Sequence, residues 1–204
     1  MPKPDVSDQR KAQILAAARD VFGRRPYEAV TMREIIAQSG LSTGAVYWYF
    51  PSKEAILTAL LEDMAAANLA VLERLQQEPG PVVARLRAFF DHMASQAQAV
   101  SSLYLTGAKY RAMLSTDPDT RAVMERIGAA YRAGLQALIE EGIARGEFRP
   151  FAPAAVTTAL LALYEGIMLL WVAAPTTVPL QESLQTAAQF VLAALTGNEG
   201  VSEG

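Results

Sequence analysis

A short run of small, hydroxylated and aromatic residues in the first quarter of the chain carries the side chains best suited to touch another molecule. Ser42, Thr43 and Gly44 come first, and Tyr47 and Tyr49 follow within two helical turns. A threonine can offer its hydroxyl to a base edge or its methyl to thymine, and phenols can donate hydrogen bonds to phosphates. Glycine lets the backbone approach closely. These residue types together predict contact with duplex DNA.

The flanking residues define the elements that must position this run. Thr31 and Glu34 have the spacing of a capping box, which opens a helix. Gly40 is suited to the left-handed conformation that ends one, Ser42 can cap the next helix, and Pro51 ends it. The pattern therefore predicts two short helices joined by a tight turn. In such a helix-turn-helix the second helix enters the major groove, and its first residues reach the bases.

Three further residues complete the predicted DNA interface. Arg33 begins the first of the two helices and could reach a guanine or a phosphate, Thr31 precedes it, and Lys53 adds a cation beyond the second helix. The alternative is that the aromatic residues near position 48 are core. Neighbouring helical residues point about 100° apart, so at least one of three consecutive aromatics should be exposed. The predicted DNA-binding residues are Thr31, Arg33, Ser42, Thr43, Gly44, Tyr47, Tyr49 and Lys53.

The longer pattern reads Thr31-x-Arg33-x-Ile35, then Gly40-Leu41-Ser42-x-Gly44-x-Val46-Tyr47-x-Tyr49-Phe50-x-x-Lys53-x-x-Ile56-Leu57, after an apolar helix that contains Ile14 and Phe22. It resembles the DNA-binding domain of the TetR family of bacterial repressors. The resemblance covers residues 10–57. Arg25 stands where this family usually has glycine, and Pro26 is a second departure. We expect both to affect only the local loop.

Composition limits the class of protein. The 204 residues are 51% hydrophobic, which is enough for one or two domains with a buried core. The absence of cysteine excludes disulfide scaffolds and zinc fingers, and no secretion signal precedes the first helix, so a cytoplasmic location is expected. The net charge is −3, but residues 1–60 carry eight basic against six acidic side chains. A mildly basic head on an acidic body suits a sequence-specific DNA-binding protein.

The rest of the chain is predicted to be helical, because alanine, leucine, glutamate and arginine dominate and alternating patterns are rare. The expected fold is all-α with about nine helices. A three-helix helix-turn-helix domain occupies residues 1–52, and a larger effector-binding and dimerisation domain occupies residues 53–200. Residues 197–204 are expected to fray. Helices after the head are predicted at 52–77, 82–98, 102–114, 117–145, 153–174 and 180–196.

Residues 154–174 are apolar and long enough to span a bilayer. However, Glu165 lies in the middle and no lysine or arginine cluster flanks the segment, which argues against a membrane span. A helix that is apolar nearly all round is otherwise buried on both sides. By resemblance to TetR proteins, segments 153–174 and 180–196 would pair with those of a second copy as a four-helix bundle. Such a homodimer would read a near-palindromic operator.

The same resemblance implies a small-molecule pocket within the later helices. Aromatic and methionine side chains with a few phenols suit an apolar or amphipathic effector, although residues at helical spacing are more often part of an ordinary core. His92 is the only histidine, which is a poor basis for a metal site, and no metal or cofactor is expected. The candidate pocket residues are Phe89, His92, Met93, Tyr104, Tyr110, Met113, Tyr131, Tyr164, Met168 and Trp171.

Three classes of protein compete. An enzyme is disfavoured, because the chain has no cysteine, a single histidine, and no phosphate-binding loop or nucleophile elbow. An all-helical ligand-binding or scaffold protein that never touches DNA would keep the body, but it has no need for Ser42, Thr43, Gly44, Tyr47 and Lys53 at these positions. The favoured interpretation is a homodimeric, ligand-responsive transcriptional repressor whose effector releases it from the operator.

Overall fold

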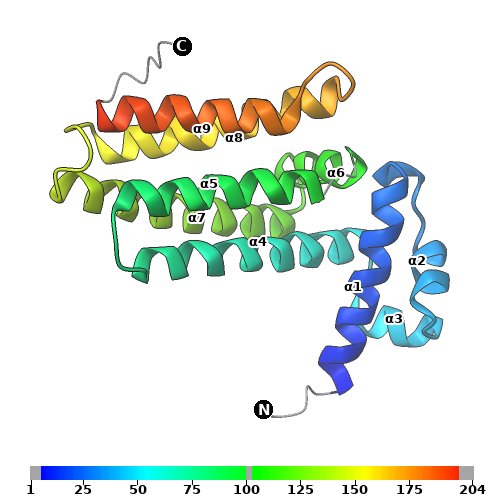
Figure 1. Ribbon diagram of the computed structural model, residues 1–204. Helices are drawn as coiled ribbons and strands as arrows, with labels where there is room; N and C mark the ends of the chain where they lie inside the picture. Colours follow the sequence, from blue (N-terminus) through cyan, green and yellow to red (C-terminus); the bar gives the residue numbers. More distant parts are fainter. Residues whose placement is uncertain (1–5, 100–102, 198–204) are drawn as a thin grey trace. The chain divides into compact units, whose positions relative to one another are not determined.

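The computed structural model describes residues 6–99 and 103–197, apart from the side chains at 98–99, 103–106 and 110. Within these ranges the fold is all-helical, with nine α-helices and one short 3-10 helix, and it contains no strand (Figure 1). This confirms the expected fold class. The expected break near residue 101 lies outside the described residues, and so does the expected frayed end at 197–204, except for Gly197.

The helices begin and end within a few residues of the bounds that the sequence predicts. Asp117 shows why, since its carboxylate accepts a hydrogen bond from the backbone N–H of Thr120 at 2.8 Å and so caps the helix that starts at Pro118. The elements are α1 (Val6–Arg24), η1 (Tyr27–Ala29), α2 (Met32–Ser39), α3 (Thr43–Tyr49), α4 (Lys53–Gln77), α5 (Val82–Ala99), α6 (Leu103–Met113), α7 (Pro118–Ala144), α8 (Pro153–Ala173) and α9 (Leu180–Thr196).

The chain forms two compact units. The first comprises residues up to 65 together with 100–126, and the second comprises 66–99 and the residues from 127 onward. The first unit therefore holds α6 and the start of α7 in addition to the three-helix head. This division differs from the expected one at residues 52 and 53, because α4 and α7 each contribute to both units. The functional division into a DNA-binding and an effector-binding part stays a prediction.

The core of the first unit lies where α1, α2, α3 and the start of α4 meet. Phe22, Ile35 and Val46 are completely buried there, and the ring of Tyr27 stacks on that of Phe22 with 5.6 Å between centroids. Ala108 of α6 is also buried in this core. Burial of each large apolar side chain contributes about 1.5–3 kcal/mol, so this core fixes the orientation of the short helices α2 and α3.

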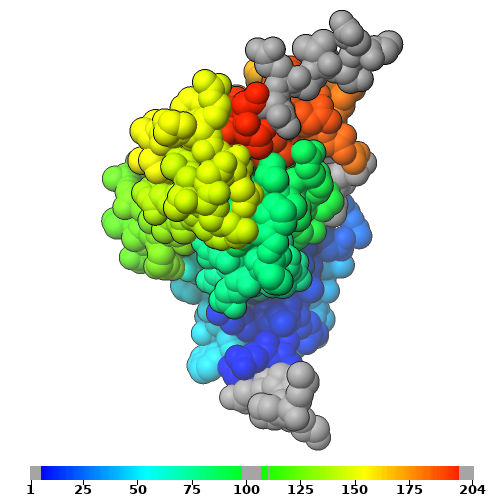
Figure 2. Space-filling model, turned by 60° about the vertical axis from the view of Figure 1, so that its left-hand side comes forward, coloured from blue at the N-terminus to red at the C-terminus, as the bar shows by residue number. Residues whose placement is uncertain are grey.

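The second unit is built on a separate core in which Leu86, Leu138 and Ile139 are completely buried. Helix α5 packs against α9, and α9 packs against α8 (Figure 1). The turn that follows α7, in yellow, lies beside the start of α5, in green, on the face shown in Figure 2.

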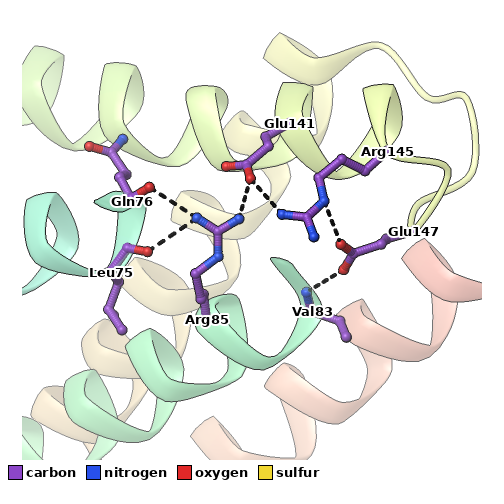
Figure 3. A network of polar contacts seen from close by, with 7 residues as sticks. All are labelled: Leu75, Gln76, Val83, Arg85, Glu141, Arg145 and Glu147. Carbon is purple, nitrogen blue, oxygen red and sulfur yellow. Dashed lines mark hydrogen bonds and ion pairs between the residues drawn. The ribbon is translucent and has the colours of Figure 1, made fainter. Parts of the chain in front are cut away.

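A polar network joins the ends of three helices in the second unit (Figure 3). The buried guanidinium of Arg85, on α5, donates to the backbone oxygens of Leu75 at 3.3 Å and Gln76 at 3.0 Å, the last carbonyls of α4. It also pairs with Glu141 of α7, which accepts a further hydrogen bond from Arg145 at 3.0 Å. These donors satisfy carbonyls that a helix end otherwise leaves unpaired.

The start of α5 is held by the same network (Figure 3). Glu147, in the turn after α7, accepts a hydrogen bond from the backbone N–H of Val83 at 3.1 Å and pairs with Arg145 at 3.1 Å. A carboxylate at a helix start is favourable, because free N–H groups and the helix dipole both attract negative charge.

By length and composition alone, two helices in the described residues could cross a membrane, α4 and α8. The sequence singled out only the second of them. One or two such helices are weak grounds for a membrane protein, because the core helix of a soluble protein passes the same test.

Candidate nucleic-acid interface

Helix α2 begins with the capping box that the sequence predicts. The Thr31 hydroxyl accepts a hydrogen bond from the backbone N–H of Glu34 at 3.3 Å, and the Glu34 carboxylate accepts from the backbone N–H of Thr31 at 2.8 Å. These hydrogen bonds hold the pKa of Glu34 below its ordinary value. The helix ends at Gly40, whose φ of 68° lies in the left-handed region.

Three residues separate helix α3 from the end of α2, and α3 is capped as expected. The Ser42 hydroxyl accepts from the backbone N–H of Ala45 at 3.2 Å, and the extended conformation of Phe50 ends the helix. Val46 is completely buried, and Phe50 nearly so. This inward face leaves the opposite face of α3 on the surface.

The structure places most of the predicted DNA-binding residues on the surface. Thr31, Arg33, Ser42, Thr43 and Gly44 are exposed. The ring of Tyr47 is also exposed, whereas that of Tyr49 is half-buried and packs against the core of the head. The small and hydroxylated residues Ser42, Thr43 and Gly44 therefore form an exposed tip at the start of α3, which the rest of the first unit does not cover.

Trp48 is a surface aromatic that sequence reasoning did not select. It is 75% exposed, and its ring meets that of Tyr49 edge-on with 4.5 Å between centroids. The sequence indicated only that one of three consecutive aromatics must be exposed. The structure identifies the tryptophan as the most exposed of the three, with Tyr47 next.

Lys53 has a structural role that the sequence did not indicate. Its ammonium donates to the backbone oxygens of Tyr27 at 2.8 Å and Val30 at 2.9 Å, and it lies 4.1 Å from the centroid of the Tyr27 ring. The ammonium therefore ties the η1 segment to the start of α4. A lysine has three donors, so one remains for a phosphate.

The same segment is held at two further points. The Tyr27 hydroxyl donates to Glu54 at 2.7 Å; burial raises the pKa of this phenol, and the hydrogen bond lowers the pKa of the Glu54 carboxyl. Arg25, one of the two departures from the family pattern, pairs with Glu34 of α2. The loop between α1 and α2 is thus fixed to the helix-turn-helix.

The candidate effector-binding residues divide between the units. Phe89 and Met168 are buried in the second unit, whereas Met113 lies in the first unit with 44% of its surface exposed. The assignment of all these residues to one effector pocket stays a prediction. The side chains of Tyr104 and Tyr110 lie outside the described part of the chain. The half-buried candidates of the second unit are His92, Met93, Tyr131, Tyr164 and Trp171.

A polar chain links several of these residues through Asn68, which the sequence did not single out. The His92 Nε2 atom donates to Asn68 Oδ1 at 2.9 Å, and the Asn68 side chain is also hydrogen-bonded to Tyr131. Burial and the nearby negative charge of Glu165 raise the pKa values of Tyr131 and Tyr164. Polar groups from α4, α5, α7 and α8 therefore gather in the second unit.

Comparison with known proteins agrees with this architecture. Residues 14–60 match the family described as "Bacterial regulatory proteins, tetR family", and residues 82–196 match "BetI-type transcriptional repressor, C-terminal". An HTH-type transcriptional regulator of Bacillus subtilis, YfiR, which is itself uncharacterised, is 29% identical over 79% of both chains.

Solved structures of other proteins share the fold, and those of SmeT and FadR are two examples. SmeT, the repressor of the Stenotrophomonas maltophilia multidrug efflux pump SmeDEF, superposes with a TM-score of 0.76 and 23% identity over 95% of this chain and 93% of SmeT. SmeT has also been solved with triclosan, at a TM-score of 0.75 and 24% identity over 96% of this chain and 95% of SmeT. FadR of Bacillus subtilis, solved with stearoyl-CoA, has a TM-score of 0.71 and 19% identity over 90% of this chain and 98% of FadR.

A capped helix-turn-helix in front of a larger all-helical body defines a transcriptional regulator, and the relatives named above are regulators rather than enzymes. The match to a repressor C-terminal region extends over more than half of the chain. The chain belongs to the TetR family of bacterial transcriptional regulators.

Proposed function

We propose that this protein is a ligand-responsive transcriptional repressor that binds a near-palindromic operator as a homodimer. The observation that carries the proposal is the exposed tip of α3. Thr43, Gly44 and Tyr47 share the face opposite the buried Val46, on a helix capped at both ends. Because the core of the head fixes this helix, its tip can enter the major groove with little reorganisation on binding.

The remaining predicted contacts surround this tip. Thr43 is the proposed base-reading residue, and Gly44 lets the helix backbone approach the bases. Tyr47 and Ser42 would donate to phosphates, and the third donor of Lys53 would add a charged contact. Thr31, Arg33 and Tyr49 complete the proposed interface.

The proposed dimer interface uses α8 and α9. Only 17% of the most apolar stretch of α8 is buried within one chain. Leu163, Leu169 and Leu170 of α8 are exposed, and Phe190 of α9 is 70% exposed. Large exposed apolar side chains on adjacent helices mark interaction surfaces. Pairing with a second copy would bury them and place two α3 helices for two half-sites of one operator.

The proposed effector is a small apolar or amphipathic molecule that binds the second unit, with no metal or cofactor. Support comes from the half-buried phenols and imidazole around Asn68, and from the triclosan and stearoyl-CoA found with two proteins of the same fold. The effector would bind the released state more tightly, so operator DNA must weaken effector binding by the same factor. The proposed place of action is the cytoplasm, without membrane insertion.

Selection from a random duplex library tests the DNA-binding proposal, because every possible operator sequence competes in the same pool. We expect enrichment of an inverted repeat whose half-sites lie about one helical turn apart, which a two-fold protein requires. Tyr47→Phe should weaken binding of the selected duplex, and Thr43→Ala should change preference at one base position by about 1 kcal/mol or more. Failure to enrich any sequence would favour a ligand-binding protein that does not touch DNA.

Gly44→Ala is the sharpest variant, because it leaves the free protein intact. A Cβ atom at Gly44 would meet nothing within 4 Å, and alanine is the better helix former by about 0.8–1 kcal/mol. We therefore expect unchanged or higher stability together with weaker operator binding. Undiminished affinity would show that the α3 backbone does not approach the DNA.

A further inference from the structure

Several arginines of the first unit are neutralised within the protein. Arg24 of α1 pairs with Asp20 at 2.6 Å, and Arg19 pairs with Asp63 at 3.0 Å. A cation held beside a carboxylate offers little net charge to a phosphate, because the two potentials largely cancel at a distance. Further ion pairs among the described residues of this unit join Arg25 with Glu34, Arg111 with Glu28, and Arg126 with Glu62.

Two cations at the start of α1 differ from these. Arg10 and Lys11 are exposed, and neither has a carboxylate at ion-pair distance within the described ranges 6–99 and 103–197. Asp8 is the acidic residue of the same region, and it is likewise exposed and outside any ion pair there. The first two turns of α1 therefore present a net positive charge that the fold does not use.

A hydrogen bond places this part of α1 beside the helix-turn-helix. The side-chain amide of Gln13 donates to the backbone oxygen of Ser39 at 2.7 Å, at the end of α2 and immediately before the turn that leads into α3. Arg10 lies three residues before Gln13, close to the same face and one turn nearer the helix start. The first turns of α1 and α3 lie at the same end of the first unit (Figure 1).

The two side chains also leave α1 on its buried side. Lys11 precedes the completely buried Ile14 by three residues and the buried Leu15 by four, and Arg10 precedes Ile14 by four. They therefore continue the stripe of α1 that packs on α2, but one turn beyond the point where the packing ends. Long flexible side chains at that position extend past the core toward whatever lies against the tip of α3.

We propose that Arg10 and Lys11 bind DNA backbone phosphates at the edge of the major groove that α3 enters. The inference rests on the proposed DNA binding and adds α1 as a second element of the interface. Contacts of this kind fix the register of a protein on the duplex and carry no base preference. The charges of Arg10 and Lys11 also explain how a chain with a net charge of −3 can attract DNA, because no carboxylate neutralises them within the described residues.

The test is the salt dependence of operator affinity for full-length Arg10→Gln and Lys11→Gln proteins. Fluorescence anisotropy with a labelled selected duplex would be recorded between about 50 and 200 mM salt. Each phosphate contact contributes about 0.9 to the slope of log affinity against log salt. A homodimer loses two contacts per substitution, so each variant should lower the slope by about 1.8.

Arg24→Gln is the matched control, because it removes the same charge from an exposed residue of the same helix that is already paired with Asp20. We expect its slope to stay close to that of the wild type. The Arg10 and Lys11 variants should also lose affinity equally across base-substituted duplexes, unlike Thr43→Ala.

Slopes for Arg10→Gln and Lys11→Gln that equal that of Arg24→Gln would overturn the inference while leaving DNA binding by α3 intact. A wild-type protein that binds no duplex would overturn both proposals. Urea midpoints equal to that of the wild type would show that the substitutions act on binding and not on folding.

Discussion

Replacing Arg85 by alanine should cost the protein about 3 kcal/mol of stability, a large loss for one side chain. The guanidinium is buried, with 5% of the side chain exposed, and serves three acceptors. Two of them are the final carbonyls of α4, and the third is the carboxylate of Glu141. Each buried acceptor left without a donor costs about 1–3 kcal/mol.

The predicted loss of about 3 kcal/mol depends on how many of the three acceptors find another donor in the variant. Glu141 is 37% exposed and keeps its hydrogen bond from Arg145, so its loss is small. The two carbonyls carry most of the cost, and water entering the space left by the side chain recovers part of it. Arg85→Lys should lose less, about 1–2 kcal/mol, because an ammonium keeps the charge but cannot span all three acceptors in the planar geometry of guanidinium.

The assay is urea unfolding followed by far-UV circular dichroism at one fixed protein concentration, since dimer formation would make stability depend on concentration. Arg87→Ala is the control on the same helix, because this arginine is exposed and should change stability by no more than about 0.5 kcal/mol. If Arg85→Ala lowered the free energy of unfolding as little as Arg87→Ala, the Arg85 network would not hold the end of α4 in place.

Three further predictions follow from the same geometry. Leu169→Lys should convert the proposed dimer to monomer in sedimentation equilibrium, because a charge placed in a buried apolar interface would lack a partner. Glu140→Lys, at an exposed position of α7, should leave the proposed dimer intact. Gly40→Ala should cost about 1–2 kcal/mol in urea unfolding, because φ is +68° there, and equal stability would mean that the turn adopts another conformation. The hydrogen bond from Arg85 lowers the pKa of Glu141 below its ordinary value of 4.5. The ionised carboxylate therefore stabilises the folded protein above pH 4.5, and this stabilisation is lost as the pH falls through the lowered pKa. Glu141→Gln should lose less stability than the wild type over that acidic range.

The helix-turn-helix could be predicted residue by residue because its determinants are local. The hydrogen bonds between Thr31 and Glu34, and from Ala45 to Ser42, join residues three apart, and Gly40 acts through its own backbone. Spacing and residue type alone therefore identify them. The exposed face of α3 follows from the same periodicity.

The contacts that the sequence did not reveal join residues far apart in the chain. Lys53 binds carbonyls 26 and 23 residues away, and Arg85 reaches Glu141 across 56. A polar side chain that binds a distant backbone oxygen leaves no periodic signal, so the sequence indicated only a free cation at Lys53 and did not single out Arg85. Only the folded structure shows which polar side chains are hydrogen-bonded within the protein.

For a related reason, the sequence did not show to which of the two units α6 belongs. An apolar helix face indicates that something covers it, but it does not identify the partner. Ala108 and Ala112 of α6 are buried in the core of the head, although the sequence placed that helix in the effector-binding part. Small residues permit two helices to approach closely, but they do not identify the partner helix. The sequence therefore gave no signal that α6 packs with the three-helix head.

The fate of the cations explains why overall charge is a poor guide to nucleic-acid binding in this chain. A count over residues 1–60 gives a charge of only +2, which is weak support for DNA binding. The structure shows that Glu34 and Asp20 are each held against an arginine, so their charges act within the fold rather than on a ligand. Arg10, Lys11 and Arg33 have no carboxylate partner among the described residues, so their charges remain available to a phosphate that comes within the screening length of about 10 Å. The relevant quantity for attraction to a duplex is therefore the charge left unpaired by folding.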